Sequence, residues 1–143
     1  MHLLKKTVLK NTFRLLFIAL FVACTSNDTE NTIPTTAKNL AGQWQLVATY
    51  ISPGGASEWK EVENGFSYTF KDDGTYLMTT SENVIEQSGV FRFENEEIFM
   101  DFNSEGEAKT LGYIMELKAT ELTLSPSFPA ICFEGCFYRF KKK

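Results

Sequence analysis

Beyond residue 40 the sequence is a series of short segments in which apolar and polar side chains alternate. In residues 66–70, aromatic side chains at positions 66, 68 and 70 alternate with polar ones. A period of two is typical of a half-buried β-strand. Similar segments lie at residues 42–51, 76–78, 89–93, 98–102, 109–117, 121–124 and 137–141, and none shows a sustained helical period. The sequence therefore predicts an all-β domain of eight short strands. In the first strand, one face should carry Trp44, Leu46, Ala48 and Tyr50.

Tight turns join several of these segments. The sequence Asp72-Asp73-Gly74 is typical of a β-hairpin turn, because Asp tolerates the turn conformation and Gly adopts a positive φ. The loop is too short and has too few acidic ligands for a calcium site. Eight short strands with tight turns fit an antiparallel up-and-down barrel, which removes exposed edges by closure. An open sandwich fits the same spacing and stays an alternative.

The first predicted strand begins with Gly42 and Trp44, and the last one carries a single arginine, Arg139. The glycine lets the backbone turn sharply and brings a large ring onto the barrel floor. This Gly-x-Trp start, with the hairpin at 70–76 and the late arginine, resembles the lipocalin-like family of small β-barrels. The resemblance implies that Arg139 packs across Trp44, in a cation–π contact of about 1–2 kcal/mol.

The amino terminus has the pattern of an export signal. Four basic residues, the last of them Arg14, precede an apolar run at 15–23 that is too short to span a membrane. The run ends Phe21-Val22-Ala23-Cys24, which resembles the lipobox of bacterial lipoproteins, although Phe21 stands where leucine is usual. In that family the chain is cut before a lipidated cysteine, which implies a membrane anchor at Cys24. An ordinary signal peptide with an incidental cysteine is the alternative.

Residues 25–39 are polar, rich in threonine and almost without apolar anchors, so we expect a flexible tether. Three parts are predicted: a signal peptide at 1–23, the lipidated cysteine and tether at 24–39, and the barrel domain at 40–143. Because Thr25 rather than aspartate follows the cysteine, sorting in the lipoprotein family implies the outer membrane of a bacterial cell envelope.

Composition excludes several classes of function. After removal of residues 1–23, 10 Lys and Arg stand against 18 Asp and Glu, a net charge of about −8. Nucleic acid needs a basic surface, so no nucleic-acid partner is expected. The single histidine, His2, lies within the signal, which removes histidine-dependent triads and histidine-ligated metals from the mature chain. We expect neither an enzyme nor a cofactor.

Abundant aromatic residues leave two interpretations of the barrel interior. An eight-stranded barrel can be filled by its own side chains or can hold one small ligand. We expect a filled lower half and a pocket near the mouth, where a small hydrophobic ligand would bind. The candidate contacts are Trp59, in the loop after the first strand, with Tyr68, Tyr76, Phe91 and Met115. Trp59 could equally plug the mouth, and a filled barrel would suit a structural or protein-interaction lipoprotein, such as an inhibitor or an envelope-complex subunit.

Two cysteines, Cys132 and Cys136, lie just before the last strand. In an exported protein, two thiols at this spacing are expected to oxidise together. The ring they close is small, so the stabilisation is on the order of 2 kcal/mol. The sequence predicts a structural disulfide.

Overall fold

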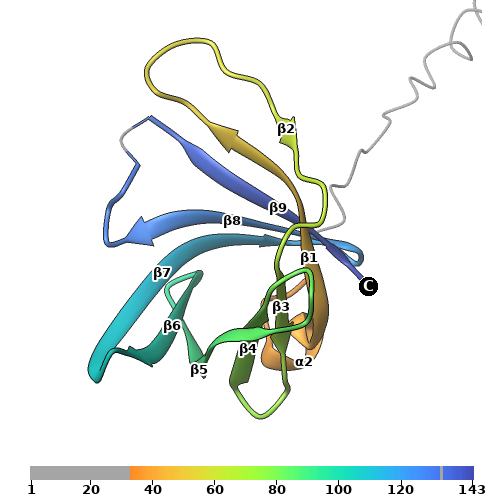
Figure 1. Ribbon diagram of the computed structural model, residues 1–143, viewed down its shortest axis with the longest axis vertical. Coiled ribbons are helices and arrows are strands. Elements are labelled where there is room, and N and C mark those ends of the chain that lie inside the picture. The colour runs from red at the N-terminus through yellow and green to blue at the C-terminus, as the bar shows by residue number, and fades with distance from the viewer. Residues whose placement is uncertain (1–32, 133) are drawn as a thin grey trace, which may run out of the picture. The chain divides into compact units, whose positions relative to one another are not determined.

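The computed structural model describes residues 33–132 and 134–143, which form a β-barrel with one short helix (Figure 1). The predicted signal peptide, Cys24 and most of the predicted tether lie outside these residues. Within the described part, no helix is long and apolar enough to cross a membrane. The elements are α2 (Ala37–Leu40), β1 (Gly42–Ile51), β2 (Lys60–Glu61), β3 (Ser67–Phe70), β4 (Thr75–Thr79), β5 (Ile85–Glu94), β6 (Glu97–Ser104), β7 (Glu107–Leu117), β8 (Glu121–Phe128) and β9 (Cys136–Lys142).

The strands form one antiparallel sheet that closes on itself. From β3 to β9 each strand pairs with the next, and β1 pairs with both β3 and β9. This closure confirms the up-and-down barrel of eight main strands and removes the open sandwich. The additional strand, β2, has two residues that pair with Ala48 and Thr49. It was not predicted, because a strand of two charged residues carries no alternating apolar pattern.

Several strands are longer than the sequence predicts, because polar side chains also face the interior. β5 begins at Ile85 rather than at residue 89. Gln87 lies beside Met78 in the β4–β5 register and donates a hydrogen bond to the hydroxyl of Tyr76. A polar side chain on the inward face interrupts the alternation on which the prediction depends.

A β-bulge halfway along β1 changes which of its side chains point into the barrel. Leu46 pairs with Phe140, whereas Ala48 pairs with the next residue back, Arg139, so Val47 is the extra residue. A shift of one residue exchanges the two faces of a strand. Trp44 and Leu46 therefore face the interior, and the prediction that Ala48 and Tyr50 share their face is wrong.

The chain after β2 crosses β1 closely at this bulge. The Val62 N–H donates to the Val47 carbonyl at 2.9 Å, and the Leu46 N–H donates to the Phe66 carbonyl at 2.9 Å. A Cβ on Gly65 would lie 2.2 Å from the Leu46 carbonyl oxygen, so this approach requires glycine. The crossing brings Phe66 into line with β3.

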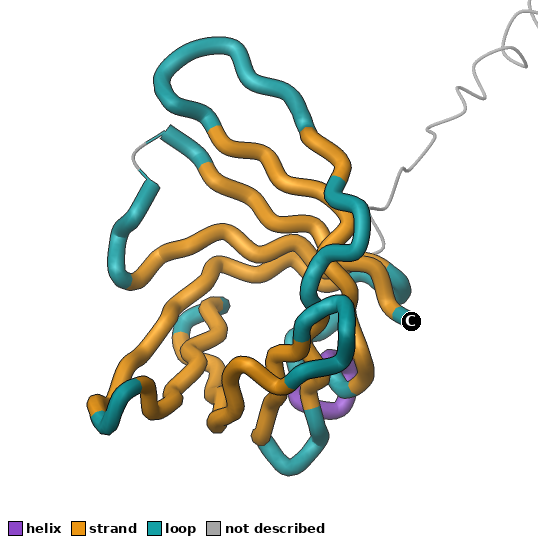
Figure 2. Tube along the Cα trace, viewed as in Figure 1, coloured by secondary structure: helices purple, strands orange, loops and turns teal. Residues whose placement is uncertain are grey.

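One end of the barrel is sealed by α2 and the residues before it (Figure 2). The Trp44 indole N–H donates to the Leu40 carbonyl at 2.7 Å, and both side chains are fully buried. The Ile33 N–H donates to the Leu117 carbonyl at 3.0 Å, and Ile33 packs against the core. Ile33 and Ala37, which the prediction placed in the tether, therefore pack against the core of the barrel.

A lysine, and not the predicted arginine, covers the floor tryptophan. The Lys142 ammonium lies 5.1 Å from the centre of the Trp44 ring. Gly42 has a φ of +132°, and a Cβ there would lie 2.8 Å from the Lys142 side chain, so glycine makes room for the lysine. The predicted pairing of Arg139 with Trp44 is wrong, because Arg139 pairs with Ala48 and lies between Tyr138 and Phe140, which face the interior, so its own side chain is on the outer face.

Replacement of Trp44 by alanine should destabilise the domain by about 3–5 kcal/mol, because it removes the largest buried side chain and opens a cavity. Urea unfolding of the two proteins measures the difference. Trp59→Ala is the matched control, since this ring is 38% exposed and its removal should cost only about 1–2 kcal/mol. Equal losses in both variants would contradict the floor assignment.

Candidate functional site

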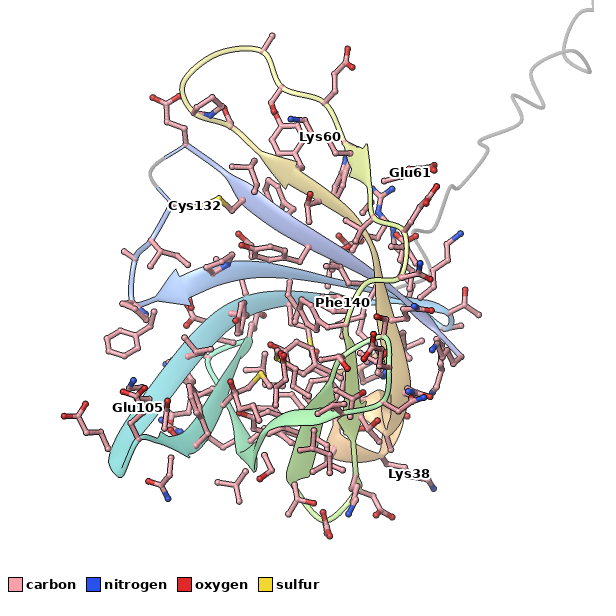
Figure 3. The ribbon with its side chains drawn as sticks, in the orientation of Figure 1. Lys38, Lys60, Glu61, Glu105, Cys132 and Phe140 are labelled. Atoms are coloured by element: carbon pink, nitrogen blue, oxygen red, sulfur yellow. A yellow bond between two sulfur atoms is a disulfide. The ribbon has the colours of Figure 1, made fainter. Side chains whose placement is uncertain are left out.

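A cavity of about 180 Å³ lies toward the end of the barrel opposite α2, which we call the open end. Its walls come from β3, β7, β8 and β9, from the residue before β3 and from the loop after β8. The lining residues are Phe66, Tyr68, Tyr113, Leu124, Pro126, Ile131, Tyr138 and Phe140. Phe140 is seen among the side chains inside the barrel, below the loop that carries Cys132 (Figure 3).

The cavity lies where β8 and β9 separate. Their pairing ends at Leu124 and Tyr138. Beyond that point β8 continues along β7, whereas β9 continues along β1, and the two strands diverge toward their connecting loop (Figure 1). Pro126 has no N–H with which to extend a ladder toward β9. Leu124, Pro126 and Tyr138 are thus brought to the walls by the antiparallel register.

Three of the lining residues are tyrosines whose hydroxyls interact. Burial raises the pKa of Tyr68 well above its ordinary value, and hydrogen bonding and charge interactions with Tyr113 raise it further. The pKa of Tyr113 is also raised, chiefly by burial. Tyr138 acts on both of these pKa values. Tyr68 and Tyr113 therefore carry neutral hydroxyls at neutral pH.

Below the cavity the barrel is filled by its own side chains. Tyr76 and Phe91 are 1% and 7% exposed, and the Phe91 ring packs edge-on against Phe70 with centroids 5.3 Å apart. Met115 packs against the same core. Of the predicted ligand contacts in the interior, Tyr68 lines the cavity, whereas Tyr76, Phe91 and Met115 belong to the filled part. The expectation of a filled lower half with a pocket nearer the mouth is confirmed in its outline.

Trp59 lies on the outside of the barrel. The Arg139 guanidinium is 3.9 Å from the centre of its ring, and the rings of Tyr50 and Phe137 lie 5.8 and 6.4 Å away. The bulge in β1 turns Tyr50 outward and creates this aromatic platform. Trp59 is not a lining residue of the cavity, so the structure does not bring it together with Tyr68, as the prediction of a shared ligand site requires. The Arg139 side chain also lies 3.7 Å from a Glu121 carboxylate oxygen.

The predicted disulfide between Cys132 and Cys136 is confirmed. It joins the start of β9 to the loop that carries Ile131, a lining residue. Sequence reasoning missed most of the lining residues, among them Tyr113, Leu124, Pro126, Ile131, Tyr138 and Phe140. Tyr113 shares the inward face of Met115 and could have been found by alternation, but Pro126 and Ile131 depend on the extension of β8 and on the loop after it.

Larger hollows lie on the surface. One of about 370 Å³ is bordered by Glu61, Glu121, Arg139 and Lys141 on the outer face of β1 and β9. Another, of about 430 Å³, lies over β5, β6 and β7. Charged side chains border both, whereas none lines the open-end cavity. Within residues 33–132 and 134–143, no group of three or more His, Cys, Asp and Glu residues could hold a metal ion.

The buried tyrosines predict a loss of stability at high pH. Burial raises the pKa of Tyr76 from 10.0 to about 12, even though the hydrogen bond from Gln87 lowers it. The folded chain then keeps a proton that the unfolded chain loses. The stabilisation is fully present below pH 10 and is lost as the pH rises toward 12, by on the order of 2 kcal/mol.

Urea unfolding at several alkaline pH values measures this loss of stability. In Tyr76→Phe, the free energy of unfolding should fall less steeply as the pH rises. A wild-type free energy of unfolding that changes no more steeply than that of Tyr76→Phe would contradict the expectation.

The chain is similar to solved structures of low sequence identity. One is an uncharacterized protein from Bacteroides eggerthii, with 20% identity and a TM-score of 0.51 over 73% of this chain and 99% of that one. Another is a lipocalin-like protein from Bacteroides uniformis, with 17% identity and a TM-score of 0.49 over the same shares. No curated protein matches the sequence.

The model of a sequence family described as "lipocalin-like domain" matches residues 40–124, which is more than half of the chain. The match begins at the buried Leu40 of α2 and runs through the Gly-x-Trp start of β1 to Leu124 in the wall of the cavity. It agrees with the closed antiparallel barrel described above. The chain belongs to the lipocalin-like domain family.

Proposed function

We propose that this chain is a membrane-anchored lipocalin-like lipoprotein that binds a small hydrophobic molecule in the cavity at the open end. The observation that supports binding is the cavity itself, about 180 Å³ of space bounded by aliphatic and aromatic side chains. Such a space is comparable to an apolar cavity of about 150 Å³ that takes up benzene. The residues that we propose as contacts are the lining residues, with Tyr68 the one among them that alternation predicted.

The chemistry of the lining supports binding rather than catalysis. Raised pKa values keep the hydroxyls of Tyr68 and Tyr113 protonated, so neither is a ready general base at neutral pH. The lining includes no serine, cysteine, histidine or acidic side chain to form a nucleophile–base pair. The lining therefore supplies neither an activated nucleophile nor a general base for a reaction at this site.

The membrane anchor is proposed at Cys24, which lies outside the described residues. Its support is the sequence pattern: a short apolar run, a small residue before the cysteine and a polar segment after it. Thr25 supports the outer membrane as the location. A lipid on Cys24 would hold the domain near a membrane without embedding it.

Cys24→Ser should move the protein out of the membrane fraction, because the mature chain would carry no acyl chain. Fractionation of cells after a salt wash, followed by immunodetection, measures this. The matched control is the double variant Cys132→Ser, Cys136→Ser, which loses the other cysteines and should stay with the membrane. A salt-resistant membrane association of Cys24→Ser would overturn the anchor.

Binding in the cavity can be tested with toluene, a neutral ring-sized probe. We expect toluene to shift the NMR signals of Leu124 and Ile131. Leu124→Phe should abolish this response by filling the space, at a cost in stability of about 1–3 kcal/mol that urea unfolding would check. Trp59→Ala should leave the response unchanged, because this ring lies outside the barrel. An equal response in wild type and Leu124→Phe would contradict binding in this cavity.

A second candidate function is a structural or protein-interaction lipoprotein with a filled barrel. The observation that favours it is an apolar rim at the open end. The rim consists of Ile51, Val84, Ile85, Phe128 and Ile131, each more than half exposed. Exposed apolar side chains gathered at one end of a domain are typical of a contact surface. The absence of any toluene response would favour this candidate.

A further inference from the structure

We propose that the ligand of the open-end cavity is a neutral molecule of about one ring that carries a hydroxyl or carbonyl group, recognised by the hydroxyls of Tyr68, Tyr113 and Tyr138. This inference rests on the proposed binding function and specifies the chemical class of the ligand. It follows from the volume of the cavity, the charge of its walls and the arrangement of its hydroxyls.

The volume limits the ligand to about one ring. Pockets for drug-sized molecules begin at about 300 Å³, whereas this cavity measures about 180 Å³. Large side chains block growth toward the floor, because Phe70 and Tyr76 are each 1% exposed and pack against Tyr68. A long acyl chain held wholly inside the barrel would have to displace this packed core, but a single ring would not.

The walls favour a neutral ligand. Phe66, Leu124, Pro126, Ile131 and Phe140 are apolar, and the remaining three lining residues are tyrosines. No Lys, Arg, Asp or Glu is among these lining residues, so a ligand carboxylate or ammonium group would be removed from water without a charged partner. Burial of an unpaired charge is costly.

The hydroxyls supply the polar recognition. Tyr68 and Tyr113 extend from β3 and β7 and interact with each other. Tyr138 reaches the cavity from β9, and its hydroxyl makes no hydrogen bond within residues 33–132 and 134–143. A tyrosine hydroxyl offers one donor and an acceptor. A ligand hydroxyl or carbonyl can therefore pair with Tyr138, whereas a hydrocarbon of the same shape leaves it without a partner.

Toluene and phenol form a matched pair of probes for this proposal, because a methyl group in one replaces a hydroxyl in the other. NMR titration of the wild-type protein at about pH 7 gives the ratio of the two affinities, and benzoate tests the effect of charge. Tyr138→Phe removes the hydroxyl and keeps the ring. Tyr50→Phe is the matched control, since Tyr50 packs against Trp59 and Phe137 on the outside.

We expect the preference for phenol over toluene to fall about three- to tenfold in Tyr138→Phe, which is the effect of one neutral hydrogen bond, and to stay unchanged in Tyr50→Phe. Benzoate should bind more weakly than phenol to the wild type. If toluene binds and the ratio is the same in wild type and Tyr138→Phe, the hydroxyl does not recognise the ligand, although the proposed binding function stands. Tighter binding of benzoate than of phenol would overturn the neutral class. If neither toluene nor phenol binds, the proposed function fails as well.

Discussion

The pairing of β1 with β9, with a bulge at Val47, is the constraint on which the rest of the structure depends. It closes the barrel, so that each of the eight main strands has a neighbouring strand on both sides over at least part of its length. Below the bulge it turns Trp44 inward, against Leu40. Above the bulge it turns Tyr50 outward, where Trp59 covers it. One extra residue therefore keeps the Tyr50 ring out of the interior near the open end.

Much of the fold could be predicted because side-chain alternation is a local signal. The eight main strands, the turn at Asp73 and Gly74, the inward Trp44 and the disulfide all follow from residues close together in sequence. In that turn the Asp73 carboxylate accepts from the Thr75 N–H at 2.9 Å, and Gly74 has a φ of +84°. The bulge could not be predicted, because it arises from the pairing of β1 with β9. These strands are neighbours in space but come from the two ends of the domain's sequence.

The site was only partly predictable for the same reason. Tyr68 was found because its strand alternates without interruption. Arg139 was predicted over Trp44, but Lys142 lies there and Arg139 lies over Trp59, since the register of β1 with β9 decides which cation meets each ring. Tyr113 and Tyr138 meet Tyr68 only after β7 and β9 have come round the barrel, and Ile131 is placed by a loop that no periodicity describes. Cavity walls built from distant strands are a property of the closed sheet.

The proposed function depends on a ring-sized space among Tyr68, Tyr113 and Tyr138, above a core that is already filled. A crystal structure determined under xenon pressure tests it most directly, because xenon enters apolar cavities of this size. We expect a xenon atom between Leu124 and the three tyrosines. Xenon found instead among Phe70, Tyr76 and Phe91, or no xenon within the barrel, would contradict it.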